Sequence, residues 1–155
     1  MTPASSLAVS IVPFVMDGHR FGLLARDVRE VLRAATPSPL PRAPAIVLGL
    51  LNVRGELVPV IDVRSRFGLR PRALAHTDHL VVATAGTRSV AFAVEAADVL
   101  VEVVADAIEV ARAHGEHVAG VVKLADGALV VYDLATFLSQ TEADQLDAAL
   151  GAGGP

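Results

Sequence analysis

The feature that most constrains the fold is an apolar stretch, residues 45–69, that is interrupted once near its middle. The first apolar run ends at residues 52–55, Asn-Val-Arg-Gly, and a second run follows over residues 57–61. Glycine allows the positive φ of a tight reversal, and asparagine tolerates turn conformations. The stretch therefore predicts two strands joined by a turn. Its tip carries Arg54, although the geometry of a turn does not require an arginine there.

Similar reversals recur along the chain. Short valine-rich runs flank glycine-containing turns at Asp17-Gly18, at residues 85–88 and at Asp126-Gly127. Asp-Gly between apolar runs is a strong hairpin signal, and short strands at regular spacing are typical of small barrels or sandwiches. We therefore predict a mainly β protein. Pro13 lies inside the first run, which predicts an edge strand or a bulged strand there.

Helical patterns are short. Val28, Val31 and Leu32 are spaced as on one helix face and predict a helix over residues 27–34. Residues 63–69 and 134–138 predict single helical turns, and residues 141–144 predict the start of a short C-terminal helix. The prolines of residues 36–44 predict an extended connector, and we expect residues 105–117 to be mostly loop.

The two halves of the chain resemble each other. Residues 55–63 and 127–134 share a turn glycine, an apolar strand, an aspartate and an apolar helix start. This repeat predicts two similar β subdomains, approximately residues 7–69 and 79–138. Residues 1–6 and 151–155 are expected to be flexible ends.

The composition limits the classes of function that the chain can have. The chain has 155 residues, 53% hydrophobic content and a net charge of −4, which favours one compact domain and argues against nucleic acid as the main partner. It has no cysteine, so disulfides and thiolate metal sites are excluded. No apolar run approaches the roughly 18 residues of a spanning helix, and residues 7–15 lack the preceding cation of a signal peptide. We therefore expect a cytoplasmic protein.

Two His-x-x-His pairs, His76/His79 and His114/His117, each enclose an acidic residue, a set that can bind zinc. Residues at i and i+3 meet on a helix, whereas Gly115 and the predicted strand at His79 disfavour one. We interpret these histidines as polar loop residues. A small β-barrel that binds a metal or a ligand through these loops remains the alternative function, and an assay for bound zinc distinguishes it.

Other candidate chemistry has a simpler interpretation. Asp62 and Asp133 each follow an apolar strand and precede a short helix, so we interpret them as helix N-caps. A cluster of arginines could bind phosphates, but it lacks interleaved aromatic residues, and we interpret its members as solvated charges: Arg64, Arg66, Arg70 and Arg72. No serine lies in a G-x-S-x-G context, and no catalytic set is apparent. The sequence predicts a protein that is not an enzyme.

The central stretch resembles the most recognisable segment of the CheW family of chemotaxis coupling proteins, whose pattern is close to G-x-x-N-L-R-G-x-x-V-P-x-x-D-L. The matching residues are Gly49, Asn52, Arg54, Gly55, Val58, Pro59, Val60 and Asp62, with Val53 in place of the usual leucine. Residues 21–23 and 28–31 resemble the family's first hairpin and its V-x-E-[VI] segment. Residues 133–138 are similar to its last strand and helix. Glu95 and Ala96-Ala97 depart from the pattern.

The resemblance implies a fold and a role. The fold would be two intertwined SH3-like five-stranded β-barrels with short connecting helices and a short C-terminal helix, in one domain over residues 7–150. The protein would be an adaptor without cofactor, metal or enzymatic activity. It would couple the cytoplasmic tip of chemoreceptors to the regulatory domain of the histidine kinase CheA, contact other CheW-like domains, and reach the membrane only through receptors.

By the same resemblance, the receptor-facing residues would be Arg54, Val28, Glu30 and Asn52. It assigns no kinase-facing residue, and it does not specify which receptors, kinase or pathway output are involved. From the apolar patterns alone we also predict six core residues: Phe21, Val31, Leu50, Val60, Phe92 and Phe137.

Overall fold

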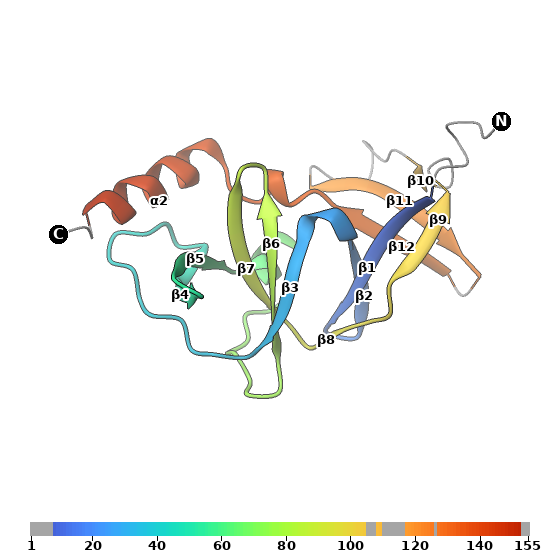
Figure 1. Cartoon of the computed structure of the whole chain (residues 1–155), viewed down its shortest axis with the longest axis horizontal. Helices are drawn as coiled ribbons and strands as arrows, with labels where there is room; N and C mark the ends of the chain where they lie inside the picture. Colours follow the sequence, from blue (N-terminus) through green and yellow to red (C-terminus); the bar gives the residue numbers. More distant parts are fainter. Residues whose placement is uncertain (1–7, 105–107, 110–116, 126, 153–155) are drawn as a thin grey trace.

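The computed structural model describes residues 8–104, 108–109, 117–125 and 127–152. Two β-sheets lie side by side along the long axis of the molecule, with one helix beside the left-hand sheet (Figure 1). The strands are β1 Ala8–Met16, β2 His19–Leu24, β3 Val28–Arg33, β4 Val47–Val53, β5 Glu56–Ile61, β6 His79–Ala85, β7 Arg88–Val94, β8 Ala96–Ala97, β9 Val101–Val104, β10 Ile108–Glu109, β11 Val118–Leu124 and β12 Gly127–Tyr132. The helices are η2 Ala25–Asp27, α1 Val63–Arg66, η5 Leu134–Thr136 and α2 Gln140–Ala152.

The chain crosses between the two sheets. Sheet 1 has the order β10-β11-β12-β2-β1-β8, with β9 also paired to β1, and sheet 2 has the order β3-β6-β7-β5-β4. Hairpin β1–β2 thus belongs to sheet 1, although the strands that follow it, β3 to β5, belong to sheet 2. In each sheet, the second strand of a central hairpin, β1–β2 or β6–β7, also forms a parallel pair. β2 pairs with β12 in sheet 1, and β7 pairs with β5 in sheet 2. The predicted mainly β fold class is confirmed, and the arrangement is consistent with two intertwined SH3-like units.

Sheet 2 rolls so that its two edge strands approach each other. Beyond β3, Ser38 pairs with Leu50 of β4 through two backbone hydrogen bonds of 2.8 and 2.7 Å. A Cβ on Gly49 would lie 2.4 Å from the carbonyl oxygen of Ser38, and the φ of Gly49 is +155°. Only glycine therefore allows this close approach, which gives the first glycine of the central pattern a structural reason.

Most of the predicted turns are present. Asp17-Gly18, Arg54-Gly55 and Gly86-Thr87 each connect two antiparallel strands. Between β11 and β12 the chain also reverses, but Asp126 lies outside the described residues. The predicted loop over residues 105–117 lies mostly outside them too, and β10 falls within it.

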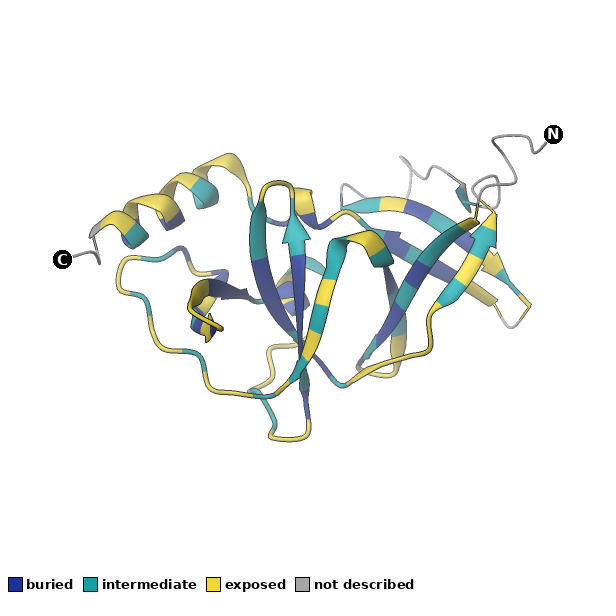
Figure 2. Cartoon of the chain, in the orientation of Figure 1, coloured by how far each residue is buried: buried dark blue, intermediate teal, exposed yellow. Residues whose placement is uncertain are grey.

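The predicted helix over residues 27–34 is wrong. After the single turn of η2, these residues form β3, which pairs with β6 and alternates between half-buried and exposed side chains (Figure 2). Val28, Glu30 and Leu32 face inward, while Arg29, Val31 and Arg33 face outward. Pairing along β6 outweighs a weak helical spacing, because short apolar runs fit either periodicity.

β1 is an interior strand, which corrects the prediction of an edge strand at Pro13. One side of β1 pairs with β2 from Ile11 to Met16, and the other side pairs first with β9 and then with β8. Pro13 lies in the gap between these two partners, and its carbonyl accepts from the backbone N–H of Asp98 at 2.8 Å. A proline is tolerated there because the ladder already changes partner at that point.

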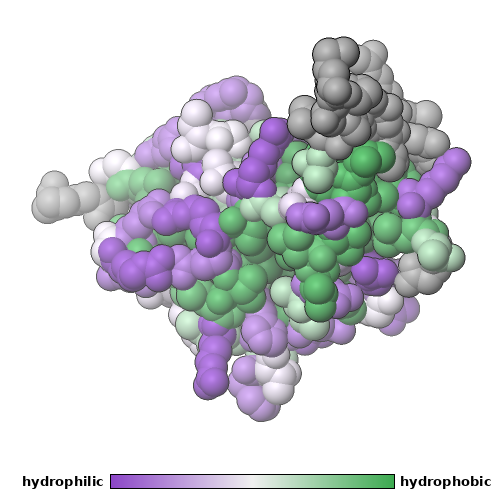
Figure 3. Space-filling view, turned by 45° about the vertical axis from the view of Figure 1, so that its right-hand side comes forward, coloured by the Kyte–Doolittle hydropathy of each residue, from purple (hydrophilic) through white to green (hydrophobic). Residues whose placement is uncertain are grey.

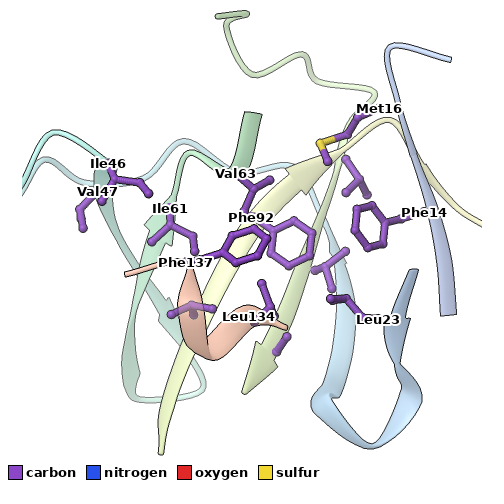
Figure 4. Packing of buried hydrophobic residues seen from close by; sticks show 14 of the residues in the cluster. Phe14, Met16, Leu23, Ile46, Val47, Ile61, Val63, Phe92, Leu134 and Phe137 are labelled. Carbon is purple, nitrogen blue, oxygen red and sulfur yellow. The ribbon is translucent and has the colours of Figure 1, made fainter. Parts of the chain in front are cut away.

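The core has three parts. The largest, around Phe14, Phe92 and Phe137, lies between the sheets (Figure 4). A second cluster is formed by side chains of sheet 2, and a third is formed by side chains of sheet 1 around Ile11 and Leu129. Both faces of β6 are therefore buried, as its continuous apolar sequence requires.

Three of the predicted core residues are buried, namely Val60, Phe92 and Phe137. Phe21 and Leu50 are only half-buried, although Phe21 stacks on Phe67 with ring centroids 4.4 Å apart. Val31 is 40% exposed, so its assignment to the core was wrong, because it rested on the helical spacing that β3 replaces.

The short helices differ in their caps. The Asp133 carboxylate accepts from the N–H of Ala135 at 3.1 Å, as predicted for an N-cap, whereas the Asp62 side chain makes no cap hydrogen bond, which corrects the prediction there. α2 begins with a reciprocal pair between Ser139 and Glu142, the two bonds of a capping box. The helix continues to Ala152, into the segment expected to be flexible.

Candidate functional site: the β4–β5 turn

The turn between β4 and β5 is a tight two-residue connection. Its central residues, Arg54 and Gly55, have φ values of 49° and 87°, and Val53 pairs directly with Glu56. Positive φ at both positions is characteristic of type I′ hairpin turns. The side chain of Asn52 accepts a hydrogen bond from the backbone N–H of Gly55 at 2.7 Å. Asn52 therefore fixes the turn that presents Arg54.

Arg54 forms a two-pronged ion pair with Glu30 on β3. Nη1 donates to Oε1 at 2.9 Å, and Nη2 donates to Oε2. The side chain of Arg54 is 71% exposed, while that of Glu30 is only 20% exposed. The hydrogen bond from Arg54 lowers the pKa of Glu30 below its ordinary value, and the same bond raises the pKa of Arg54. The site is therefore a charged pair on the surface, with the arginine outermost.

A second set of contacts lies beside this pair. Nη1 of Arg29, the neighbour of Glu30, donates to Glu56 at 3.0 Å and to Ser89 at 2.6 Å. Glu56 directly follows the turn. Two consecutive residues of β3, Arg29 and Glu30, therefore bind the residue after the turn and the arginine within it. No sequence pattern indicated these partners, because only the rolling of sheet 2 brings them together.

The predicted receptor-facing residues thus fall into two groups. Arg54, Glu30 and Asn52 lie together at the turn, and the sequence had not predicted that Arg54 pairs with Glu30. Val28 lies on the same strand as Glu30, but it pairs with Ala83 across a bulge and packs partly against the central core. Its exposed surface is correspondingly limited.

The other candidate sites do not assemble. His76 is exposed, and Nδ1 of His79 lies 3.4 Å from the carbonyl oxygen of Glu95. His117 contacts the hydroxyl of Thr136 at 2.9 Å, and His114 lies outside the described residues. Within the described ranges, no three His, Asp or Glu side chains gather as a metal site would require.

For three of its four members, the arginine cluster is not a set of solvated charges, whereas Arg70 is exposed as predicted. Arg64 pairs with Asp17 and Arg72 with Asp78, while Arg66 binds Glu142 and the carbonyl of Phe137. These guanidinium groups are therefore engaged within the protein. Arg64 is even buried, with 8% of its surface exposed, which the sequence interpretation missed.

The chain matches the CheW-like domain family model over residues 10–142. It belongs to the CheW-like family. Similar curated proteins are the chemotaxis protein CheW of Treponema pallidum, 34% identical over 68 residues that cover 44% of this chain and 40% of that protein, and CheW of Rhizobium meliloti, 30% identical over 86 residues that cover 56% of each. Protein FrzA of Myxococcus xanthus is 38% identical over 69 residues, covering 41% of this chain and 43% of FrzA. The matches span about half the length of these relatives.

Among solved structures, the scaffolding protein CheW of Thermoanaerobacter tengcongensis has a TM-score of 0.79 and 23% sequence identity. The match covers 88% of this chain and 96% of that one. This likeness shows that the CheW-like chain has the same fold. Among its described helices, none has the length and apolarity needed to cross a membrane.

Proposed function

We propose that this CheW-like protein is a non-enzymatic cytoplasmic adaptor that couples the cytoplasmic tips of chemoreceptors to the regulatory domain of the histidine kinase CheA. The observation that carries the proposal is the exposed Arg54–Glu30 pair, which stands at the matching positions of the family pattern. Control of the kinase would be a coupling free energy between the two binding surfaces.

The chemistry of Arg54 suits a binding residue. A guanidinium has five N–H donors, and two of the donors of Arg54 are used by Glu30. The remaining donors are available to acceptors on a receptor helix. Because Glu30 already holds the side chain, less conformational entropy would be lost when a partner binds. Glu30 and Asn52 would thus act mainly by positioning Arg54, and Val28 would add apolar contact.

Apolar side chains on the surface also support an adaptor. Among the residues that the structure describes, the large apolar ones that are at least 40% exposed are Val31, Leu48, Leu57, Val99, Leu100 and Val104. Figure 3 shows one face on which apolar and charged surfaces are interspersed. Such surfaces favour protein partners, including CheA and other CheW-like domains, over nucleic acid. We also propose that residues 7–150 form one domain of two strand-exchanged subdomains, about 7–69 and 79–138, which the sheet topology supports.

The test is a binding experiment on the Arg54→Ala variant. We expect its affinity for a receptor-tip fragment to fall about 5- to 150-fold, equivalent to about 1–3 kcal/mol, with little change in affinity for the CheA regulatory domain. Arg70→Ala is the matched control, since Arg70 is also exposed but lies beyond α1. Unchanged receptor binding by Arg54→Ala would refute the assignment of the site, and loss of both partners would refute the separation of the two surfaces.

A further inference from the structure

Strand β3 contains one extra residue beside the turn that carries Arg54. The pairing of β3 with β6 passes from Val28, opposite Ala83, directly to Glu30, opposite Val82. Arg29 is therefore the additional residue of a β-bulge. Bulges of this kind redirect side chains, and they are over-represented next to functional sites.

The bulge lets two neighbouring side chains reach the same turn. In a regular strand, successive side chains point to opposite faces of the sheet, so only one of the two would point toward the turn. Here Glu30 binds Arg54 within the β4–β5 turn, and Arg29 binds Glu56 directly after it. The turn is thus held at two points from one short segment of β3.

Arg29 also ties the turn to a third strand. Its Nη1 donates to Oε1 of Glu56 at 3.0 Å and to Oγ of Ser89 at 2.6 Å. Glu56 begins β5, whereas Ser89 belongs to β7, the central strand of sheet 2. Because a guanidinium is planar and donates in fixed directions, these two bonds restrict where Glu56, and the turn with it, can lie.

This restriction matters for Arg54, because its own ion pair holds it only weakly. The side chain of Arg54 is 71% exposed, so solvent screens its attraction to Glu30. The pair persists only while the backbone of the turn stays beside β3. Arg29 secures that position from the other side of Gly55. The side chain of Arg29 is half as exposed, at 35%, and it is already engaged by two acceptors.

We propose that Arg29 is a positioning residue for the binding site at Arg54. By holding Glu56 and Ser89 together, it keeps the β4–β5 turn against β3, where Arg54 stays paired with Glu30 and its outer donors face a partner. This role rests on the proposed function for the receptor as that partner, whereas the position of Arg54 can be measured on the protein alone.

The first measurement therefore needs no partner. NMR relaxation of the ¹⁵N-labelled protein gives the order parameter of the Nε–H group of Arg54. Arg29→Met removes the guanidinium but keeps a long side chain, and we expect this order parameter to fall. Ser89→Ala removes one of the two acceptors and should give a smaller fall. Arg33→Met is the matched control, since Arg33 is exposed on the same strand but pairs with His79 at its other end, and it should leave the value unchanged.

The second measurement separates positioning from direct contact. We expect Arg29→Met to weaken the binding of a receptor-tip fragment about 2- to 10-fold, which is the order of the entropy cost of fixing one side chain on binding. In protein that already carries Arg54→Ala, the same change should cause no further loss, because Arg29 acts through Arg54. An equal loss in both backgrounds would mean that Arg29 contacts the receptor itself, and it would overturn the proposal.

The two measurements also distinguish this role from the proposed function. If the order parameter of Arg54 is the same in Arg29→Met as in the wild type, Arg29 does not position Arg54, whatever the receptor does. If it falls while Arg54→Ala leaves receptor binding unchanged, the positioning of Arg54 stands and the receptor assignment fails. Melting curves establish that each variant is folded, and Ser89→Ala decides both measurements if Arg29→Met does not fold.

Discussion

The units β4–β5–α1 and β11–β12–η5 have the same architecture but different surfaces. In each, a hairpin is followed by an aspartate and a short helix, and its second strand pairs in parallel with a central hairpin. The burial along the two second strands is also similar: both begin exposed and end largely buried. In the first unit, however, two arginines stand where the second has alanines.

The pairing register defines which residues are equivalent. Val53 pairs with Glu56 around the first turn, and Leu124 pairs with Gly127 around the second. Gly127 is thus equivalent to Glu56, and not to Gly55 as the sequence repeat had indicated. With this register Asp62 matches Asp133 without a gap. Arg54 then matches Ala125, and Arg64 matches Ala135.

The comparison shows that one backbone unit carries arginines in two different environments. Ala125 and Ala135 are both exposed, so neither position requires a charge for the unit to fold. Arg54 is exposed and paired at the surface, whereas only 10% of the Arg64 side chain is exposed. Substitutions that make the first unit more like the second should therefore have very different effects on stability.

Arg64→Ala should have the largest effect. It removes a buried side chain, its bond to the Arg70 carbonyl and the partner of Asp17, and we expect a loss of about 2–3 kcal/mol of unfolding free energy. This lies below the usual range for a fully buried pair, because the side chain of Asp17 is 35% exposed. Urea denaturation measures the loss. The reciprocal change, Ala135→Arg, should alter stability by less than about 0.5 kcal/mol; equal effects would refute the comparison.

The next largest effect is a difference in stability between the alanine variants of Asp62 and Asp133. Asp133→Ala removes an N-cap hydrogen bond and should cost about 1 kcal/mol, whereas Asp62→Ala removes no cap bond and should cost less. Thermal melts of both variants under the same conditions check this order. A larger loss for Asp62→Ala would mean that its carboxylate has a structural role that the cap geometry does not reveal.

Arg54→Ala should have a small effect on stability. The pair with Glu30 is formed by a largely exposed side chain, where solvent screens the attraction, so we expect little loss of stability. The melting temperature of the variant beside that of Arg64→Ala measures the difference between the two arginines. If Arg54→Ala melts as early as Arg64→Ala, the turn arginine is structural, and its assignment as a binding residue loses support.

The smallest expected effect is a loss of folding stability at low pH. The bond from Arg54 lowers the pKa of Glu30 below its ordinary 4.5, so the folded state favours the carboxylate. The resulting stabilisation is present above pH 4.5 and is lost as the pH falls through the lowered value. Wild-type protein should therefore lose slightly more stability between pH 7 and pH 3 than Glu30→Gln does. Chemical denaturation at both pH values tests this, and identical losses would contradict it.

The sequence could predict the elements whose cause is local. Asp17-Gly18 and Arg54-Gly55 reverse the chain because their residues accept positive φ, and the valine-rich runs beside them form strands. The secondary structure of residues 27–34 could not be predicted in this way. A short apolar spacing fits either a helix or a strand, and the pairing with β6 decides between them. The resemblance placed Arg54, Glu30 and Asn52 on one surface, but it did not indicate their contacts.

By itself the sequence determined the turns, the mainly β character, the family pattern and the position of Arg54 at a hairpin tip, because each depends on neighbouring residues. Only the tertiary structure decided which sheet each strand joins, that Glu30 holds Arg54, and that Arg64 is buried. These features depend on the exchange of strands between sheets and on the rolling of sheet 2, which bring together residues far apart in the chain. No local pattern records such contacts, since their partners are chosen by register and packing.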